Sequence, residues 1–153
     1  MKTLIVYYSR TNTTKEIANK LQKKLDCDIE EITDGEKYKG KLGFMKGGMN
    51  ATMGRASDID PISKNPSDYD LIIVGTPVWS SNMAPPVFTY LVKYRDHIKN
   101  MASFCTCMGG GYDKTLEKIA FVSGKKQIST MFLTSEDIEN PDKKINTFIN
   151  NIQ

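Results

Sequence analysis

Short apolar segments recur along this chain, and segments with the spacing of amphipathic helices lie between most of them. Residues 4–8 and 71–74 are continuously apolar, which is typical of strands that helices cover on both faces. Strands are predicted at residues 4–8, 28–32, 70–75, 102–107 and 128–133. This alternation of strands and helices predicts an α/β protein with a parallel sheet and helices on both of its faces.

Length and composition predict one globular domain over residues 1–153, with 25% charged and 39% hydrophobic residues. No apolar run is long enough to span a membrane. The first strand begins at residue 4, which leaves no room for a signal peptide. We therefore expect a cytoplasmic protein without a membrane span.

The cysteines and charges predict neither a disulfide framework, nor a metal site, nor a nucleic-acid site. Cys27, Cys105 and Cys107 are an odd number, which fits a reducing compartment. The only histidine, His97, falls at the polar end of a predicted helix, away from the cysteines. Segment 37–57 holds five basic residues and no acid, within a net charge of only +3. Because no nucleic-acid motif accompanies it, we interpret this segment as a solvated flap or a docking surface for an acidic partner.

The turn after the first strand is rich in hydroxyl groups. It consists of Ser9, Arg10, Thr11, Asn12, Thr13 and Thr14, and a helix is predicted directly after it at residues 15–26. A helix N-terminus presents unpaired N–H groups and partial positive charge, which suits a phosphate. Helix capping is the simpler interpretation, although five capping residues in six positions exceed what one helix needs. The turn therefore predicts a nucleotide-phosphate site.

Two further loops follow the third and fourth predicted strands, at the same edge of the sheet. The loop at 76–83 contains Trp79, the only tryptophan, whose ring could stack on an aromatic ligand. The loop at 107–112 contains three consecutive glycines, which allow the backbone to approach a ligand closely. Ligands of open α/β sheets bind beyond the carboxyl ends of the strands, so three loops converge on one predicted site.

Over essentially its whole length the chain resembles the flavodoxin-like family of FMN-binding proteins. The family phosphate loop Ser/Thr-x-Thr-Gly-x-Thr is matched by Ser9, Thr11 and Thr14, with Asn12 where glycine is usual. Asparagine is the next best residue for a positive φ. Residues 76–79 resemble the family loop that packs against the isoalloxazine ring, and residues 107–111 the loop that bonds its pyrimidine edge.

The resemblance implies a three-layer flavodoxin-like fold, with a five-stranded parallel sheet in the order 2-1-3-4-5 and FMN as the cofactor. It implies that the cofactor contacts are Ser9, Arg10, Thr11, Asn12, Thr13, Thr14, Thr76, Pro77, Val78, Trp79, Ser80, Cys107, Met108, Gly109, Gly110, Gly111 and Tyr112. No catalytic acid, base or nucleophile and no metal ligand is assigned.

The expected function is electron transfer through bound FMN, to a redox partner protein or a small-molecule acceptor. The chain is too short for a separate nicotinamide domain, which favours a carrier over an NAD(P)H-dependent FMN or quinone reductase. A non-redox nucleotide-binding module is the alternative from another class. Residues 76–83 and 105–112 contain no charged side chain. We therefore expect a less negative potential for the second electron than in carriers with acidic loops.

Overall fold

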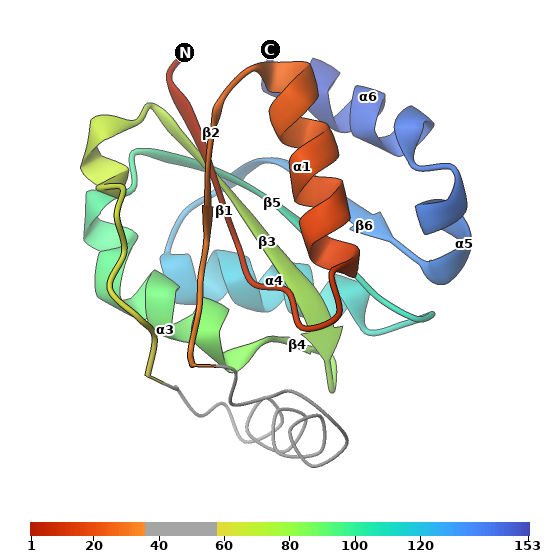
Figure 1. Ribbon diagram of the computed structural model, residues 1–153, viewed down its shortest axis with the longest axis horizontal. Helices are drawn as coiled ribbons and strands as arrows, with labels where there is room; N and C mark the ends of the chain where they lie inside the picture. Colours follow the sequence, from red (N-terminus) through yellow and green to blue (C-terminus); the bar gives the residue numbers. More distant parts are fainter. Residues whose placement is uncertain (36–57) are drawn as a thin grey trace.

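A computed structural model describes residues 1–35 and 58–153 of the chain (Figure 1). The basic segment 37–57 lies outside the described residues. The strands are β1 (Thr3–Tyr7), β2 (Asp28–Glu31), β3 (Leu71–Trp79), β4 (Asn82–Met83), β5 (Asn100–Thr106) and β6 (Gln127–Leu133). The α-helices are α1 (Thr13–Leu25), α3 (Pro85–Tyr94), α4 (Tyr112–Ser123), α5 (Ser135–Glu139) and α6 (Asp142–Ile152), and short 3-10 helices cover Pro66–Asp68 and Arg95–His97.

The sheet has the order β2-β1-β3-β5-β6, and every neighbouring pair in this order is parallel. This confirms the predicted order 2-1-3-4-5, because β5 and β6 are the fourth and fifth predicted strands. β4 is an addition of two residues that pairs antiparallel with the end of β3. The parallel pairing places the carboxyl ends of β1, β3 and β5 side by side.

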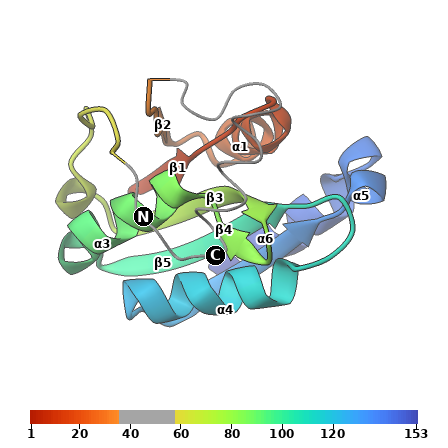
Figure 2. The ribbon, with the colours of Figure 1, turned by 90° about the horizontal axis from the view of Figure 1, so that it is seen from below.

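Helices cover both faces of the sheet, as predicted, with α1 on one side and α4 on the other (Figure 2). Successive residues of a strand point to opposite faces. One core therefore contains Leu4, Val6, Ile72 and Val74 together with Val87, Leu91 and Ile119 of α3 and α4. The other contains Ile5, Tyr7, Leu71 and Ile73 together with Ile17 and Leu21 of α1 and Ile145 and Phe148 of α6.

The prediction of a loop over 76–83, with Trp79 on it, was wrong except at Ser80 and Ser81, which form a turn between two strands. β3 continues to Trp79, because Thr76 and Pro77 still pair with Cys105 and Thr106 of β5. The chain then folds back into β4, which leaves Trp79 only 5% exposed. Burial of this large ring outweighs the tendency of a proline to end a strand.

Two helices differ from the prediction. α1 begins at Thr13, two residues earlier than expected, so the hydroxyl-rich turn enters the helix itself. The short helix α5 was not predicted. In residues 1–35 and 58–153, no helix has the length and apolar character needed to cross a membrane.

Candidate functional site

The loop between β1 and α1 turns the chain sharply at Asn12, whose φ is 71°. This confirms the expectation that asparagine replaces the usual glycine at a positive φ. The backbone of Asn12 accepts a hydrogen bond from the N–H of Glu16 at 2.9 Å. The hydroxyl of Ser9 accepts one from the N–H of Lys15 at 3.2 Å. Ser9 therefore caps α1, while α1 still begins with N–H groups that a helix leaves without intrahelical partners.

The second predicted loop is a hairpin between β3 and β4. Its two turn residues, Ser80 and Ser81, both have positive φ, 51° and 59°. A two-residue hairpin turn of this kind is usually Asn-Gly, because serine at positive φ is strained. The Thr76 hydroxyl fixes the base of the hairpin, since it accepts a hydrogen bond from the N–H of Ala84 at 3.0 Å.

The third predicted loop packs against this hairpin at Gly111, which has a φ of 82°. A Cβ atom at Gly111 would lie 2.9 Å from Oγ of Ser81 and 3.1 Å from its Cα. Only glycine therefore fits between α4 and the hairpin. Ser135, at the start of α5, donates a hydrogen bond to the Met108 carbonyl at 3.2 Å and holds the same loop from its other side.

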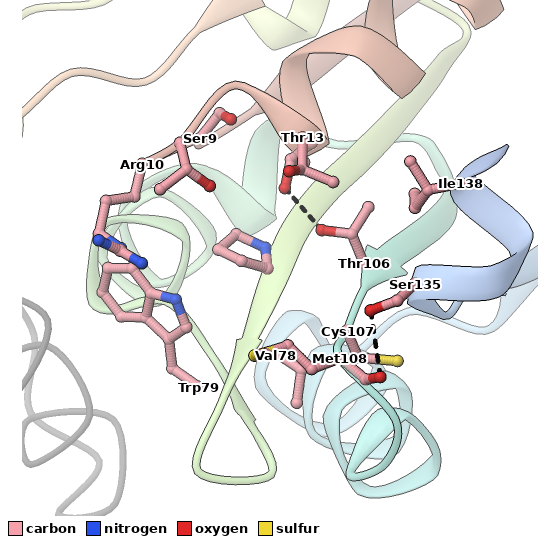
Figure 3. A pocket seen from close by; sticks show the side chains of 13 residues that line it. Ser9, Arg10, Thr13, Val78, Trp79, Thr106, Cys107, Met108, Ser135 and Ile138 are labelled. Carbon is pink, nitrogen blue, oxygen red and sulfur yellow. Dashed lines mark hydrogen bonds between the residues drawn. The ribbon is translucent and has the colours of Figure 1, made fainter.

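These loops enclose a cavity of about 340 Å³ beyond the carboxyl ends of β1, β3 and β5 (Figure 3). This volume lies within the range of small-ligand sites. The cavity is lined by Ser9, Arg10, Thr11, Thr13, Thr14, Pro77, Val78, Trp79, Thr106, Cys107, Met108, Ser135 and Ile138.

The lining of the cavity is divided by chemistry. In Figure 3 the hydroxyl groups of Ser9 and Thr13 lie together at the top of the view, near the N-terminus of α1, and the apolar side chains of Val78, Trp79 and Met108 lie below. Arg10 is the only charged side chain among the described residues that line the cavity. The arrangement offers hydrogen-bond donors and one positive charge to an anion, and an apolar surface to a ring.

Trp79 is held in place by Tyr8. The two rings meet edge to face, with 5.7 Å between centroids and an angle of 89° between planes. Figure 3 shows Arg10 extending toward the Trp79 ring. The indole therefore sits between the first loop and the hairpin, and one of its sides contributes to the cavity.

Ten of the seventeen predicted contacts line this cavity: Ser9, Arg10, Thr11, Thr13, Thr14, Pro77, Val78, Trp79, Cys107 and Met108. The other seven, Asn12, Thr76, Ser80, Gly109, Gly110, Gly111 and Tyr112, do not, and their contact with a cofactor stays a prediction. Tyr112 instead stacks on Phe132, with 3.8 Å between ring centroids. Gly109 and Gly110 are exposed at the tip of the third loop.

Sequence reasoning missed Thr106, Ser135 and Ile138. The last two belong to α5, which a capping box at its N-terminus stabilises: Thr134 accepts from the N–H of Asp137, and Asp137 accepts from the N–H of Thr134. The hydrogen bond from Lys144 is the main reason that the pKa of Asp137 lies below its usual value. The Thr-x-x-Asp spacing is a known helix-start signal and could have revealed α5.

Cys107 lines the cavity as a neutral thiol. Burial raises its pKa, and its sulfur donates a weak hydrogen bond to the Leu133 carbonyl at 3.6 Å. Across residues 1–35 and 58–153, no three side chains of histidine, cysteine, aspartate or glutamate gather in a way that could hold a metal ion. Among the described residues, the groups that the cavity presents to a ligand are its hydroxyls, the N-terminus of α1, Arg10 and the apolar wall.

Comparison with known proteins identifies the family to which this chain belongs. A model of the flavodoxin family matches residues 2–143. The structure of a flavoprotein from Lactobacillus acidophilus NCFM in complex with FMN is 26% identical, with a TM-score of 0.76, over 94% of this chain and 97% of that one. The apo-form from the same organism is also 26% identical, with a TM-score of 0.63, over 91% of this chain and 95% of that one.

Oxidised flavodoxin 1 from Bacillus cereus shares the fold at 18% identity and a TM-score of 0.58, over 99% of this chain and 97% of that one. No curated protein sequence matches the chain. Because the family model covers nearly all of the chain, this protein belongs to the flavodoxin family.

The strained hairpin turn yields a prediction about stability. Replacing Ser80→Asn together with Ser81→Gly provides residues that tolerate positive φ, and should raise the free energy of unfolding by about 1 kcal/mol. Urea unfolding of the cofactor-free protein measures this change. Ser81→Ala keeps a Cβ atom at the same φ and should give no gain. If Ser81→Ala stabilised the protein as much as the double variant, backbone strain would not be the cause.

Proposed function

We propose that this chain binds FMN in the cavity between the three loops and transfers electrons through it. The observation that carries the proposal is the division of the cavity into a hydroxyl-rich end at the N-terminus of α1 and an apolar wall that includes Trp79. The FMN complex of the relative from Lactobacillus acidophilus, 26% identical over nearly the full chain, supports the same ligand.

The phosphate of FMN suits the first loop. Ser9, Thr11 and Thr13 would supply hydroxyl donors without adding charge, and Arg10 would supply one positive charge against a phosphate. The start of α1 adds N–H groups and the positive end of the helix dipole. Among the described residues that line the cavity, no carboxylate opposes the anion.

The isoalloxazine ring suits the apolar wall. Val78, Trp79 and Met108 offer a surface on which an aromatic ring is desolvated. The glycines at 109–111 would let backbone N–H groups reach its polar edge. FMN, when bound, supplies the redox chemistry, and the protein holds and orients it and limits its contact with water.

Electron carriage is the activity that this site supports. The described residues that line the cavity include no paired acid and base and no activated nucleophile. A redox partner protein or a small-molecule acceptor would exchange electrons with the ring directly. We place the protein in a reducing compartment such as the cytoplasm, because Cys27, Cys105 and Cys107 are all free thiols.

Trp79 provides a direct test of FMN binding, because it is the only tryptophan in the chain. Titrating the cofactor-free protein with FMN should quench its tryptophan fluorescence, with an endpoint of one FMN per chain, and the complex should absorb in the blue. Adenosine monophosphate, which has a phosphate but no flavin ring, should produce far less quenching. A protein that stays colourless and unquenched with excess FMN would instead be a non-redox module.

Mixing the FMN-loaded protein with NADH or NADPH separates a carrier from a reductase. A carrier without a nicotinamide site should show no steady oxidation of either nucleotide, measured at 340 nm, when no partner reductase is added. Dithionite should still reduce the bound FMN, which verifies that the cofactor can accept electrons. Continuous NAD(P)H oxidation by the protein alone would assign it to the reductases.

Residues 76–83 and 105–112 contain no charged side chain, and this predicts how a charge added there changes the potential. Met108 is 89% exposed at the rim of the cavity, and Phe121 is 87% exposed in the last turn of α4, about 15 Å along the helix from the third loop. Met108→Glu should lower the two-electron potential by about 20 mV, equivalent to about 1 kcal/mol, because it disfavours added negative charge nearby.

Phe121→Glu introduces the same charge at a distance and should change the potential much less, since salt screens charges beyond about 10 Å. Redox titration at about 0.1 M salt, where the screening length is about 10 Å, measures both variants. Equal shifts in the two variants would show that the ring does not lie beside Met108.

A further inference from the structure

Two buried hydroxyls from distant parts of the chain meet at the back of the cavity. Oγ1 of Thr14, in the first turn of α1, lies 2.8 Å from Oγ1 of Thr106, the last residue of β5. The two residues are 2% and 5% exposed, and both line the cavity. Figure 3 labels Thr106 and marks this bond with a dashed line. The bond joins the helix that carries the hydroxyl-rich turn to the strand that ends in the third loop.

The pair has two hydroxyl protons, and the bond between the two residues uses only one of them. Each hydroxyl carries one proton and can accept two hydrogen bonds. One of the two protons lies in the bond between Thr14 and Thr106, and the other is directed elsewhere. Neither hydroxyl is hydrogen-bonded to any other group in residues 1–35 and 58–153. The pair can therefore donate one hydrogen bond to a ligand, from one of its two ends.

The position of α1 determines which end donates. Thr14 belongs to the first turn of α1, the helix end whose dipole attracts an anion, whereas Thr106 belongs to a strand, an element with only a small net dipole. An anion beside Thr14 favours the order in which Thr106 donates to Thr14 and Thr14 donates to the anion. Hydrogen bonds in such a chain strengthen one another in a buried site.

We propose that Thr106 is a positioning residue for the phosphate of the bound cofactor: its hydroxyl fixes that of Thr14 as a donor. The inference rests on the proposed binding of FMN. Recognition of the phosphate would then involve β5, through Thr106, as well as the first loop. The effect should be specific to phosphorylated ligands, because the hydrogen bond that Thr106 would orient is donated to the anion.

Riboflavin provides the discriminating probe, because it has the ring of FMN and no phosphate. The dissociation constants of both ligands are measured by the quenching of Trp79 in the cofactor-free protein. Thr106→Val keeps the shape of the side chain and removes the hydroxyl. It should weaken FMN binding about tenfold, the effect of losing one oriented hydrogen bond to a charged group, and leave riboflavin binding unchanged.

Two further variants separate positioning from packing. Thr106→Ser retains the hydroxyl and should keep the wild-type preference for FMN over riboflavin to within about twofold. Ser103→Ala removes a buried hydroxyl of the same strand, one with no hydrogen-bond partner in the described residues, and should not change the preference. Urea unfolding of each cofactor-free variant verifies that it is folded.

The outcomes distinguish a failure of this inference from a failure of the proposed function. If the wild type binds FMN and Thr106→Val retains its preference for FMN, Thr106 does not position Thr14. The same conclusion follows if Thr106→Val weakens both ligands equally, or if Thr106→Ser behaves like Thr106→Val. If the wild type binds neither ligand, the proposed function itself fails.

Discussion

The site depends on the parallel pairing of β1, β3 and β5. Tyr7 of β1 is in register with Gly75 of β3, and Gly75 with Phe104 of β5, so the three strands end close together. The pairing also requires a residue without a side chain at Gly75, since a Cβ atom there would lie 2.3 Å from the Phe104 ring. Each loop then starts from the same edge, although the loops are far apart in the sequence. The cavity is a consequence of this register.

Strained backbone is concentrated where the loops meet. In residues 1–35 and 58–153, four residues other than glycine have positive φ, and Asn12, Ser80 and Ser81 are three of them. The fourth, Asp26, ends α1. Each costs free energy that the surrounding structure must offset. At the hairpin the offset comes from burial of Trp79 and from the tight contact of Ser81 with Gly111, so the strained turn lies next to the cavity that Trp79 lines.

Sequence patterns predicted those features that follow from local chemistry. The continuous apolar runs predicted the strands of the sheet, and the hydroxyl-rich turn predicted one end of the cavity, because burial and helix capping are encoded by nearby residues. The end of β3 could not be predicted from a proline and two serines, because it depends on pairing with β5 and β4. Thr106 was not predicted for a related reason. A threonine at the end of a strand carries no sequence signal of its own, and its proximity to Thr14 arises only in the folded chain.

The phosphate and the ring of FMN are expected at different loops of the cavity, and a crystal structure of the chain with FMN tests this most directly. The phosphate should lie at the N-terminus of α1 within hydrogen-bond distance of hydroxyls of the first loop (Ser9, Thr11, Thr13 or Thr14), with the isoalloxazine against Trp79. A phosphate bound elsewhere, or a cavity that the protein's own side chains fill while FMN is in excess, would contradict it.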